Sequence, residues 1–151
     1  MNEVKRSIKA LELDKVLKLL AKQASLDDTA ALCGEILPRF SVAEVEHLLA
    51  KKGDAYNLIA KFGTPSFGSV KNVSAYLSNA KAGGGLSPAA LLQIGELLRV
   101  VRGVREWKDS CAGLRTSLDD YFGMLSPNKY FEDRIFFCIK NEDEINDNAS
   151  S

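Results

Sequence analysis

Apolar and polar positions follow the spacing of α-helices along most of this chain, and the longest such run covers residues 83–108. This run, GGGLSPAALLQIGELLRVVRGVREWK, opens with three glycines and then has Ser87 at an N-cap position and Pro88 at the first helical position. Two rows of apolar residues follow at spacings of three and four: Leu91, Ile94, Leu98 and Val101, and Leu97, Val100, Val104 and Trp107. Because the two rows merge into one wide apolar face, the pattern predicts a core helix roughly 30 Å long.

The same spacing predicts shorter helices on both sides of this one. Before it we expect a basic lead-in over residues 1–10 and then helices over 13–24, 29–37, 42–62 and 70–82. After it we expect helices over about 114–125 and 129–139. Short connections favour antiparallel neighbours, so we expect the helix over 70–82 to run antiparallel to the long one. No β-rich block is present, and the predicted fold class is all-α: an irregular multi-helix bundle forming a single helical domain over residues 1–151.

Local signals place several helix ends. Asp27 or Asp28 can cap the second helix, and Ser41 with Glu44 forms a capping box before the third. Gly63 provides a stop for the third helix. The glycines at 53, 95 and 103 are unusual inside long helices, where a glycine costs about 1 kcal/mol relative to alanine.

Composition narrows the classes of partner. Lysine plus arginine equals aspartate plus glutamate at twenty each, so net charge provides no general attraction to nucleic acid or to an anionic membrane. Cys33, Cys111 and Cys138 are far apart and odd in number, which favours reduced thiols over a disulfide framework or a zinc site. No apolar run is long enough for a signal peptide or a membrane span. We therefore expect a cytoplasmic protein that does not contact a membrane.

Motifs for catalysis are missing from the chain. The single histidine, His47, has no second histidine with which to form a metal site. The GGGLSPAA segment has glycines before a helix, but no lysine or paired hydroxyl follows to meet phosphates, so a helix-starting turn is the better interpretation. We expect this chain to have no catalytic residues, no metal ligands and no cofactor of its own.

Arg99, Arg102 and Arg105 recur every three residues on the long helix and are the candidate nucleic-acid contacts. Arginines at this spacing can hold successive phosphates with their forked donors. The alternative is that they flank the apolar face and form ion pairs with Glu96, Glu106 or neighbouring helices, which is the more common role for such residues.

Three stretches in the same order resemble the amino-terminal region of bacterial MutS type-two proteins, which are MutS paralogues without the mismatch-recognition domain. They are KALELDKVLKLLAKQA (9–24), GTPSFGSVKNV (63–73) with the GGGLSPAALLQIGELLRVVRGV that follows, and FFCIKNEDEINDNAS (136–150). The resemblance covers essentially the whole chain from residue 9. It implies the first part of a MutS-like core and lever domain.

The resemblance also implies properties of a longer protein. Members of that family continue into an ATPase domain, which uses ATP and Mg and forms a homodimer, and usually into a small endonuclease domain. The implied partners are branched or recombining DNA, or collided ribosomes and their rRNA. Since this chain contains neither the ATPase nor the nuclease motifs, we expect an amino-terminal fragment of a longer chain, either excised or from a truncated reading frame.

Two functions from different classes follow. The first is a helical scaffold that connects an ATP-driven dimer to a clamp around nucleic acid, with a role in suppressing recombination or in splitting ribosomes. The alternative is a stand-alone all-α adaptor that binds a protein partner through an apolar groove. The sequence leaves open whether DNA or the ribosome is the partner of the scaffold, because both present phosphates.

Overall fold

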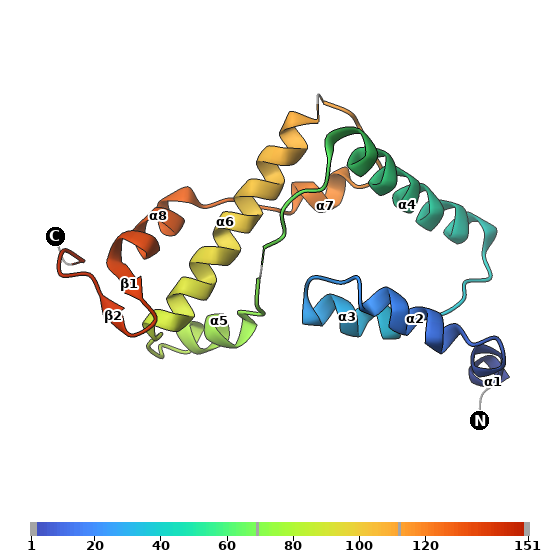
Figure 1. Cartoon of the computed structure of the whole chain (residues 1–151), viewed down its shortest axis with the longest axis horizontal. Coiled ribbons are helices and arrows are strands. Elements are labelled where there is room, and N and C mark those ends of the chain that lie inside the picture. Colours follow the sequence, from blue (N-terminus) through green and yellow to red (C-terminus); the bar gives the residue numbers. More distant parts are fainter. Residues whose placement is uncertain (1–2, 69, 112, 150–151) are drawn as a thin grey trace. The chain divides into compact units, whose positions relative to one another are not determined.

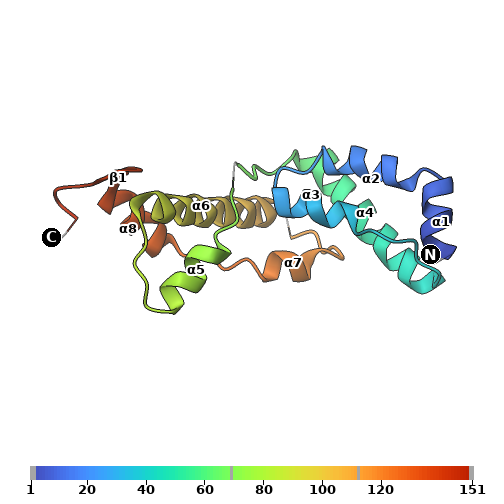
Figure 2. The ribbon, with the colours of Figure 1, turned by 90° about the horizontal axis from the view of Figure 1, so that it is seen from below.

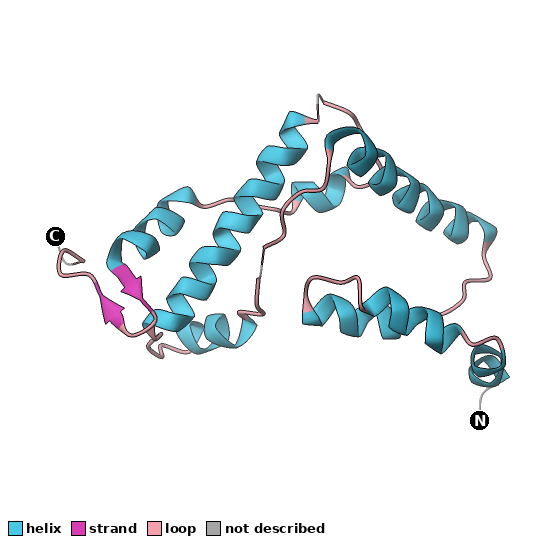
Figure 3. Cartoon of the chain, viewed as in Figure 1, coloured by secondary structure: helices cyan, strands magenta, loops and turns pink. Residues whose placement is uncertain are grey.

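The computed structural model describes residues 3–68, 70–111 and 113–149, with side chains from residue 6 onward. Helices make up most of this part of the chain, and the only strands in it form one small hairpin (Figure 3). The all-α prediction is therefore confirmed. The chain divides into two compact units, Met1–Phe40 and Ser41–Ser151. The prediction of one domain over the whole length stays a prediction.

The first unit consists of three short helices, α1 (Glu3–Ala10), α2 (Leu13–Ala21) and α3 (Asp27–Gly34). The α2 helix packs against both of the others, and its Leu17 side chain is buried. The stretch predicted as a lead-in is thus helical. The capping prediction for Asp27 and Asp28 is wrong, since Leu26 occupies the N-cap position and both aspartates lie inside the first turn of α3, where negative charge is favourable.

The second unit begins with α4 (Val42–Phe62), whose bounds match the prediction. Ser41 Oγ accepts a hydrogen bond from the backbone N–H of Glu44 at 3.5 Å, and Gly63 ends the helix with a φ of 78°. The helix continues through Gly53 without a break. The next helix, α5 (Ser74–Lys81), starts later than predicted because Asn72 Oδ1 holds the N–H of Ser74 at 2.8 Å in a turn.

The long predicted helix is α6 (Pro88–Ser110), and it is the centre of the second unit. Ser87 Oγ accepts from the N–H of Ala90 at 3.2 Å, so the predicted cap is confirmed. α8 (Lys129–Cys138) packs along α6, as both ribbon views show (Figures 1 and 2). α5 lies obliquely to α6 in both views and not alongside it, so the predicted antiparallel pair is wrong in this respect. The glycine-rich turn between them allows that angle.

The segment after α6 departs most from the prediction. α7 covers only Asp119–Gly123, because side-chain hydrogen bonds to Thr116 and Ser117 hold the preceding residues in a non-helical path. Asn128 caps α8 through a 3.1 Å hydrogen bond from the N–H of Phe131. α8 ends at Cys138, and β1 (Ile139–Asn141) then pairs antiparallel with β2 (Glu144–Ile145).

The buried core of the second unit is small. Its buried apolar residues are Leu58, Val73, Ala90, Val104, Cys111 and Ile139. Many large apolar side chains are instead exposed, and α4 carries several of them. Where such side chains form a contiguous patch, they mark a surface for interaction.

Candidate functional site

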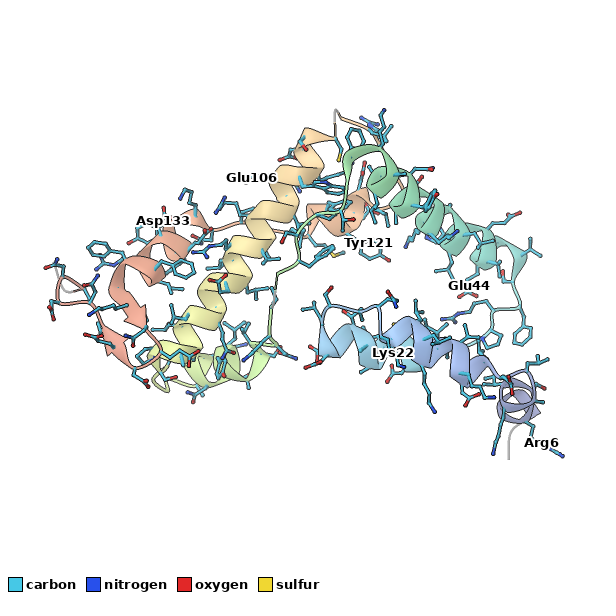
Figure 4. The ribbon with its side chains drawn as sticks, in the orientation of Figure 1. Arg6, Lys22, Glu44, Glu106, Tyr121 and Asp133 are labelled. Carbon is cyan, nitrogen blue, oxygen red and sulfur yellow. The ribbon has the colours of Figure 1, made fainter. Side chains whose placement is uncertain are left out.

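The three candidate arginines lie on the half of α6 that faces α8 and α7. α6 places them at i, i+3 and i+6, so each side chain meets a different neighbour. Arg102 reaches α8, Arg105 reaches α7, and Arg99 lies between its own helix and α8. Figure 4 labels Glu106, a partner of Arg102, on α6 and Asp133 on α8.

Arg102 makes the most complete set of contacts. Its Nε and Nη2 donate to the two carboxylate oxygens of Glu132 on α8 at 2.8 and 2.7 Å. Its Nη1 donates to the carboxylate of Glu106 at 3.1 and 3.3 Å. The two-point contact with Glu132 has the fork geometry that makes arginine–carboxylate pairs strong and directional.

Glu132 is the buried charge of this site, with only 5% of its side chain exposed. The hydrogen bonds from Arg102 hold the pKa of the Glu132 carboxyl below its ordinary value, against the opposing effect of burial. They also raise the pKa of Arg102. A buried carboxylate that loses such a partner is left uncompensated, which is strongly unfavourable. The pair therefore fixes α8 on α6.

Arg99 is more accessible than Arg102, with 49% of its side chain exposed. Its Nη1 donates to Glu96 at 3.0 Å, and its Nε lies 3.8 Å from Glu132. The guanidinium also lies 4.0 Å from the centre of the Phe136 ring, a cation–π contact. Arg99 thus adds a second positive charge beside the buried carboxylate and keeps an outward-facing surface.

Arg105 and Lys108 hold the segment after α6. Arg105 Nη1 donates to the backbone carbonyl of Phe122 at 2.8 Å, and Lys108 Nζ donates to the carbonyl of Leu114 at 2.6 Å. Lys108 also pairs with Asp119 at 2.9 Å. The Lys108 ammonium, followed by the Thr116 hydroxyl, lowers the pKa of Asp119 to about 2. Arg105, Lys108 and Asp119 line a cavity of about 330 Å³ at the end of α6.

Asp54 connects α4 to this same segment. Its Oδ2 accepts from both the backbone N–H and the hydroxyl of Ser117, each at 2.7 Å. The N–H of Ser117, followed by its hydroxyl, lowers the pKa of Asp54. Nearby, Lys51 Nζ lies 2.8 Å from the hydroxyl of Tyr121 on α7. The two contacts fix the middle of α4 to the loop before α7 and to α7.

All three arginines are therefore engaged with groups of the chain itself. Two of the partners proposed from sequence, Glu96 and Glu106, are confirmed. The main partner, Glu132, was not predicted. The sequence feature that could have indicated it is its position on the face of α8 that also carries Ile135, because an apolar residue is expected on that face. Contact with nucleic acid through these arginines stays a prediction.

The described residues provide little for bond-making chemistry. They contain no group of three or more histidine, cysteine, aspartate or glutamate side chains placed to hold a metal ion. The three cysteines are free, and Cys111 is buried. No helix in the described part of the chain is long and apolar enough to cross a membrane. That this chain has no catalytic residue stays a prediction.

The first unit carries an apolar groove of about 410 Å³. Leu17 and Ala21 of α2 line it from one side, and Ala30, Ala31 and Gly34 of α3 line it from the other. Asp14 and Lys18 stand among its lining residues and are its charged groups. Small residues along one side leave room for the side chains of a bound segment.

No family model matches the chain, but several curated proteins align over nearly all of it. It is 32% identical to the endonuclease MutS2 of Acetivibrio thermocellus over 99% of its length. It is 33% identical to the endonuclease MutS2 of Agathobacter rectalis over 97% of its length and 32% identical to that of Clostridium acetobutylicum over all of it. In each case the chain spans 19% of the relative's length.

Proposed function

Since this chain is a partial MutS2-like region, we propose that it is part of the helical core and lever scaffold of a protein that acts on nucleic acid and uses ATP in other domains. In this proposal the chain has no catalytic role and transmits movement between an ATPase dimer and a clamp on DNA or on the ribosome. ATP, Mg and endonuclease activity belong to the other domains of the longer protein.

One observation carries the proposal: the Arg102–Glu132 pair, which joins α6 to α8 by two hydrogen bonds of 2.8 and 2.7 Å around a buried carboxylate. A scaffold that transmits movement needs helices that stay together under load. Arg102 places directional polar contacts between α6 and α8, and Arg105 and Lys108 place them between α6 and α7. Asp54 adds a polar tie between α4 and the loop before α7. Apolar contacts alone would allow the helices to slide.

Nucleic-acid contact remains part of the proposal, and Arg99 is its first candidate. Arg99 has the most exposed side chain of the three arginines, at 49% against 38% for Arg105 and 27% for Arg102. A phosphate can approach its outward-facing side without breaking the Arg102–Glu132 pair. Arg102 and Arg105 would have to give up hydrogen bonds within the chain to do the same.

The experiment uses a full-length MutS2 protein that carries this region and measures ATP hydrolysis with and without DNA or ribosomes. We expect Arg102→Ala to leave the basal ATPase rate unchanged and to remove its stimulation by the nucleic-acid partner, because the lever has lost its rigid junction. Lys129→Ala is the matched control, since Lys129 pairs with Asp133 only on the exposed side of α8. Unchanged stimulation in Arg102→Ala would contradict the scaffold role.

The adaptor alternative has its own supporting feature, the apolar groove of the first unit. Leu17→Lys would block that groove, and an adaptor with this mutation would lose a protein partner without any change in ATPase stimulation. The dependence of binding on salt concentration also distinguishes the scaffold function from the adaptor function. Binding to nucleic acid weakens linearly on a log–log plot as salt rises, whereas binding through an apolar groove hardly changes.

A further inference from the structure

The contacts that anchor α4 to the described part of the second unit gather on one face. Leu58 is 1% exposed on this face, Asp54 accepts two hydrogen bonds from Ser117, and Lys51 contacts Tyr121. Lys51 lies at the middle of the helix, and Asp54 and Leu58 lie in its second half. Figure 4 labels Tyr121 beside this half and Glu44 near the opposite end.

A second face of α4, turned away from the anchors, is mostly apolar and mostly exposed, with Val45 half-buried. Its members recur at alternating spacings of three and four, and we call them the α4 seam: Val42, Val45, Leu49, Lys52, Tyr56 and Ile59. The exposed fractions are 73% for Val42, 60% for Leu49, 67% for Tyr56 and 44% for Ile59. This spacing is the a and d pattern of a coiled-coil helix, in which the apolar residues face another helix.

Two charged residues lie beside or within the α4 seam: Glu46 before its midpoint and Lys52 after it. The spacing of the helix places Lys51, Asp54 and Lys61 toward the anchored side of α4. Within the described part of the chain neither Glu46 nor Lys52 forms an ion pair, and the Lys52 ammonium lies 5.9 Å from the centre of the Tyr56 ring. A seam with an acidic residue on one side of its midpoint and a basic residue on the other is complementary to a reversed copy of itself.

We propose that the α4 seam binds the α4 seam of a second copy of this chain, with the two helices antiparallel. A two-fold axis near the middle of the seam places Val42 beside Ile59 of the second copy, and Val45 beside Tyr56 of the second copy. Leu49 then packs on the methylene stem of Lys52 of the second copy, and that ammonium reaches Glu46. The two-fold symmetry repeats every contact, as a closed dimer requires.

The parallel arrangement is disfavoured by the same residues. It would place Lys52 directly against Lys52 at the centre of the seam, and like charges at such a position oppose association. The helix dipoles also favour opposite directions. The antiparallel register is therefore specified by charge, and the apolar positions supply the attraction.

Charge exchange tests this register directly. Sedimentation equilibrium of the 151-residue chain measures the dimer dissociation constant for the wild type and for Glu46→Lys, Lys52→Glu and the variant with both changes. We expect each single change to weaken the dimer by about tenfold or more. The double variant restores the wild-type value, because it exchanges the two charges across the interface. Lys61→Glu, which reverses a charge on the other side of α4, is the control and leaves the dimer intact.

Leu49→Gln provides a second and independent test. Because the Leu49 side chain is 60% exposed, we expect this change to leave the fold of the single chain intact, and circular dichroism checks that expectation. We expect the dimer to be lost nonetheless. A wild-type chain that stays monomeric at every attainable concentration would overturn the proposal, and so would a double charge variant that fails to restore the dimer.

Discussion

Two glycines of α6 provide a matched pair of substitutions, because their surroundings differ while their helix is the same. A Cβ added at Gly95 would lie 3.1 Å from Ile135 Cγ2 and 3.1 Å from Phe136 Cζ, both on α8. A Cβ added at Gly103 would meet no atom within 4 Å. Alanine at each position therefore reports on whether α8 packs closely against α6.

The magnitudes follow from two opposing effects. In a helix interior alanine is favoured over glycine by about 1 kcal/mol, so Gly103→Ala is expected to raise the free energy of unfolding by up to about 1 kcal/mol. Gly95→Ala has the same gain, but the new methyl forces Ile135 and Phe136 outward. Such overpacking costs about 1–3 kcal/mol. Gly95→Ala is thus expected to be less stable than Gly103→Ala by about 1–3 kcal/mol.

Urea denaturation followed by circular dichroism measures both variants, and the fluorescence of Trp107, the single tryptophan, provides a second probe. A third variant combines Gly95→Ala with Phe136→Leu, which removes the ring atoms nearest to the new methyl. We expect this combination to lose less stability than the sum of the two single changes. Equal stabilisation by alanine at Gly95 and Gly103 would refute the close packing of α8 on α6.

Three further predictions concern the polar ties. Asp54→Ala is expected to lower the melting temperature, because it leaves the N–H of Ser117 without its acceptor. Asp120→Ala, at an exposed position of α7, is the control and should leave the melting temperature unchanged. Equal effects of the two changes would contradict the role of Asp54. Because the folded-state pKa of Asp119 is lowered to about 2, its stabilising effect is full above the ordinary aspartate pKa of about 4 and is lost as the pH falls toward 2. Urea titrations of the wild type and Asp119→Asn should therefore converge as the pH falls through this range, and a constant difference would contradict the shift. Arg99→Ala is expected to reduce the slope of log binding constant against log salt concentration for DNA or rRNA by about one. The melting temperature should stay close to that of the wild type. An unchanged slope would show that Arg99 does not contact the nucleic acid.

Helix positions could be predicted from the sequence where capping signals and apolar spacing agree. The bounds of α4 and the start of α6 follow from Ser41, Ser87 and Pro88, each of which acts within a few residues of its own position. The resemblance to the MutS type-two proteins was also evident before the structure. These features depend on residues that are close together in the sequence, so they could be predicted from the sequence alone.

The predictions failed where distant residues decide the local structure. The segment before α7 is apolar enough to suggest a helix, but Asp54, which lies 63 residues earlier in the chain, accepts the N–H of Ser117 and holds it in a loop. The partner of Arg102 lies 30 residues further along, on α8. Periodicity identifies the faces of helices but not their neighbours, so neither contact could be found from spacing.

A double-mutant cycle between Arg102 and Glu132 tests the central claim most directly. The unfolding free energies of the wild type, Arg102→Ala, Glu132→Ala and the variant with both changes give the coupling between the two side chains. Lys129 and Asp133, which pair at 2.7 Å on the exposed side of α8, provide the control cycle. We predict a favourable coupling for Arg102–Glu132 that clearly exceeds the coupling of the exposed pair, because only the first pair holds a buried carboxylate. A coupling no larger than that of the control would contradict the claim that this pair fixes α8 to α6.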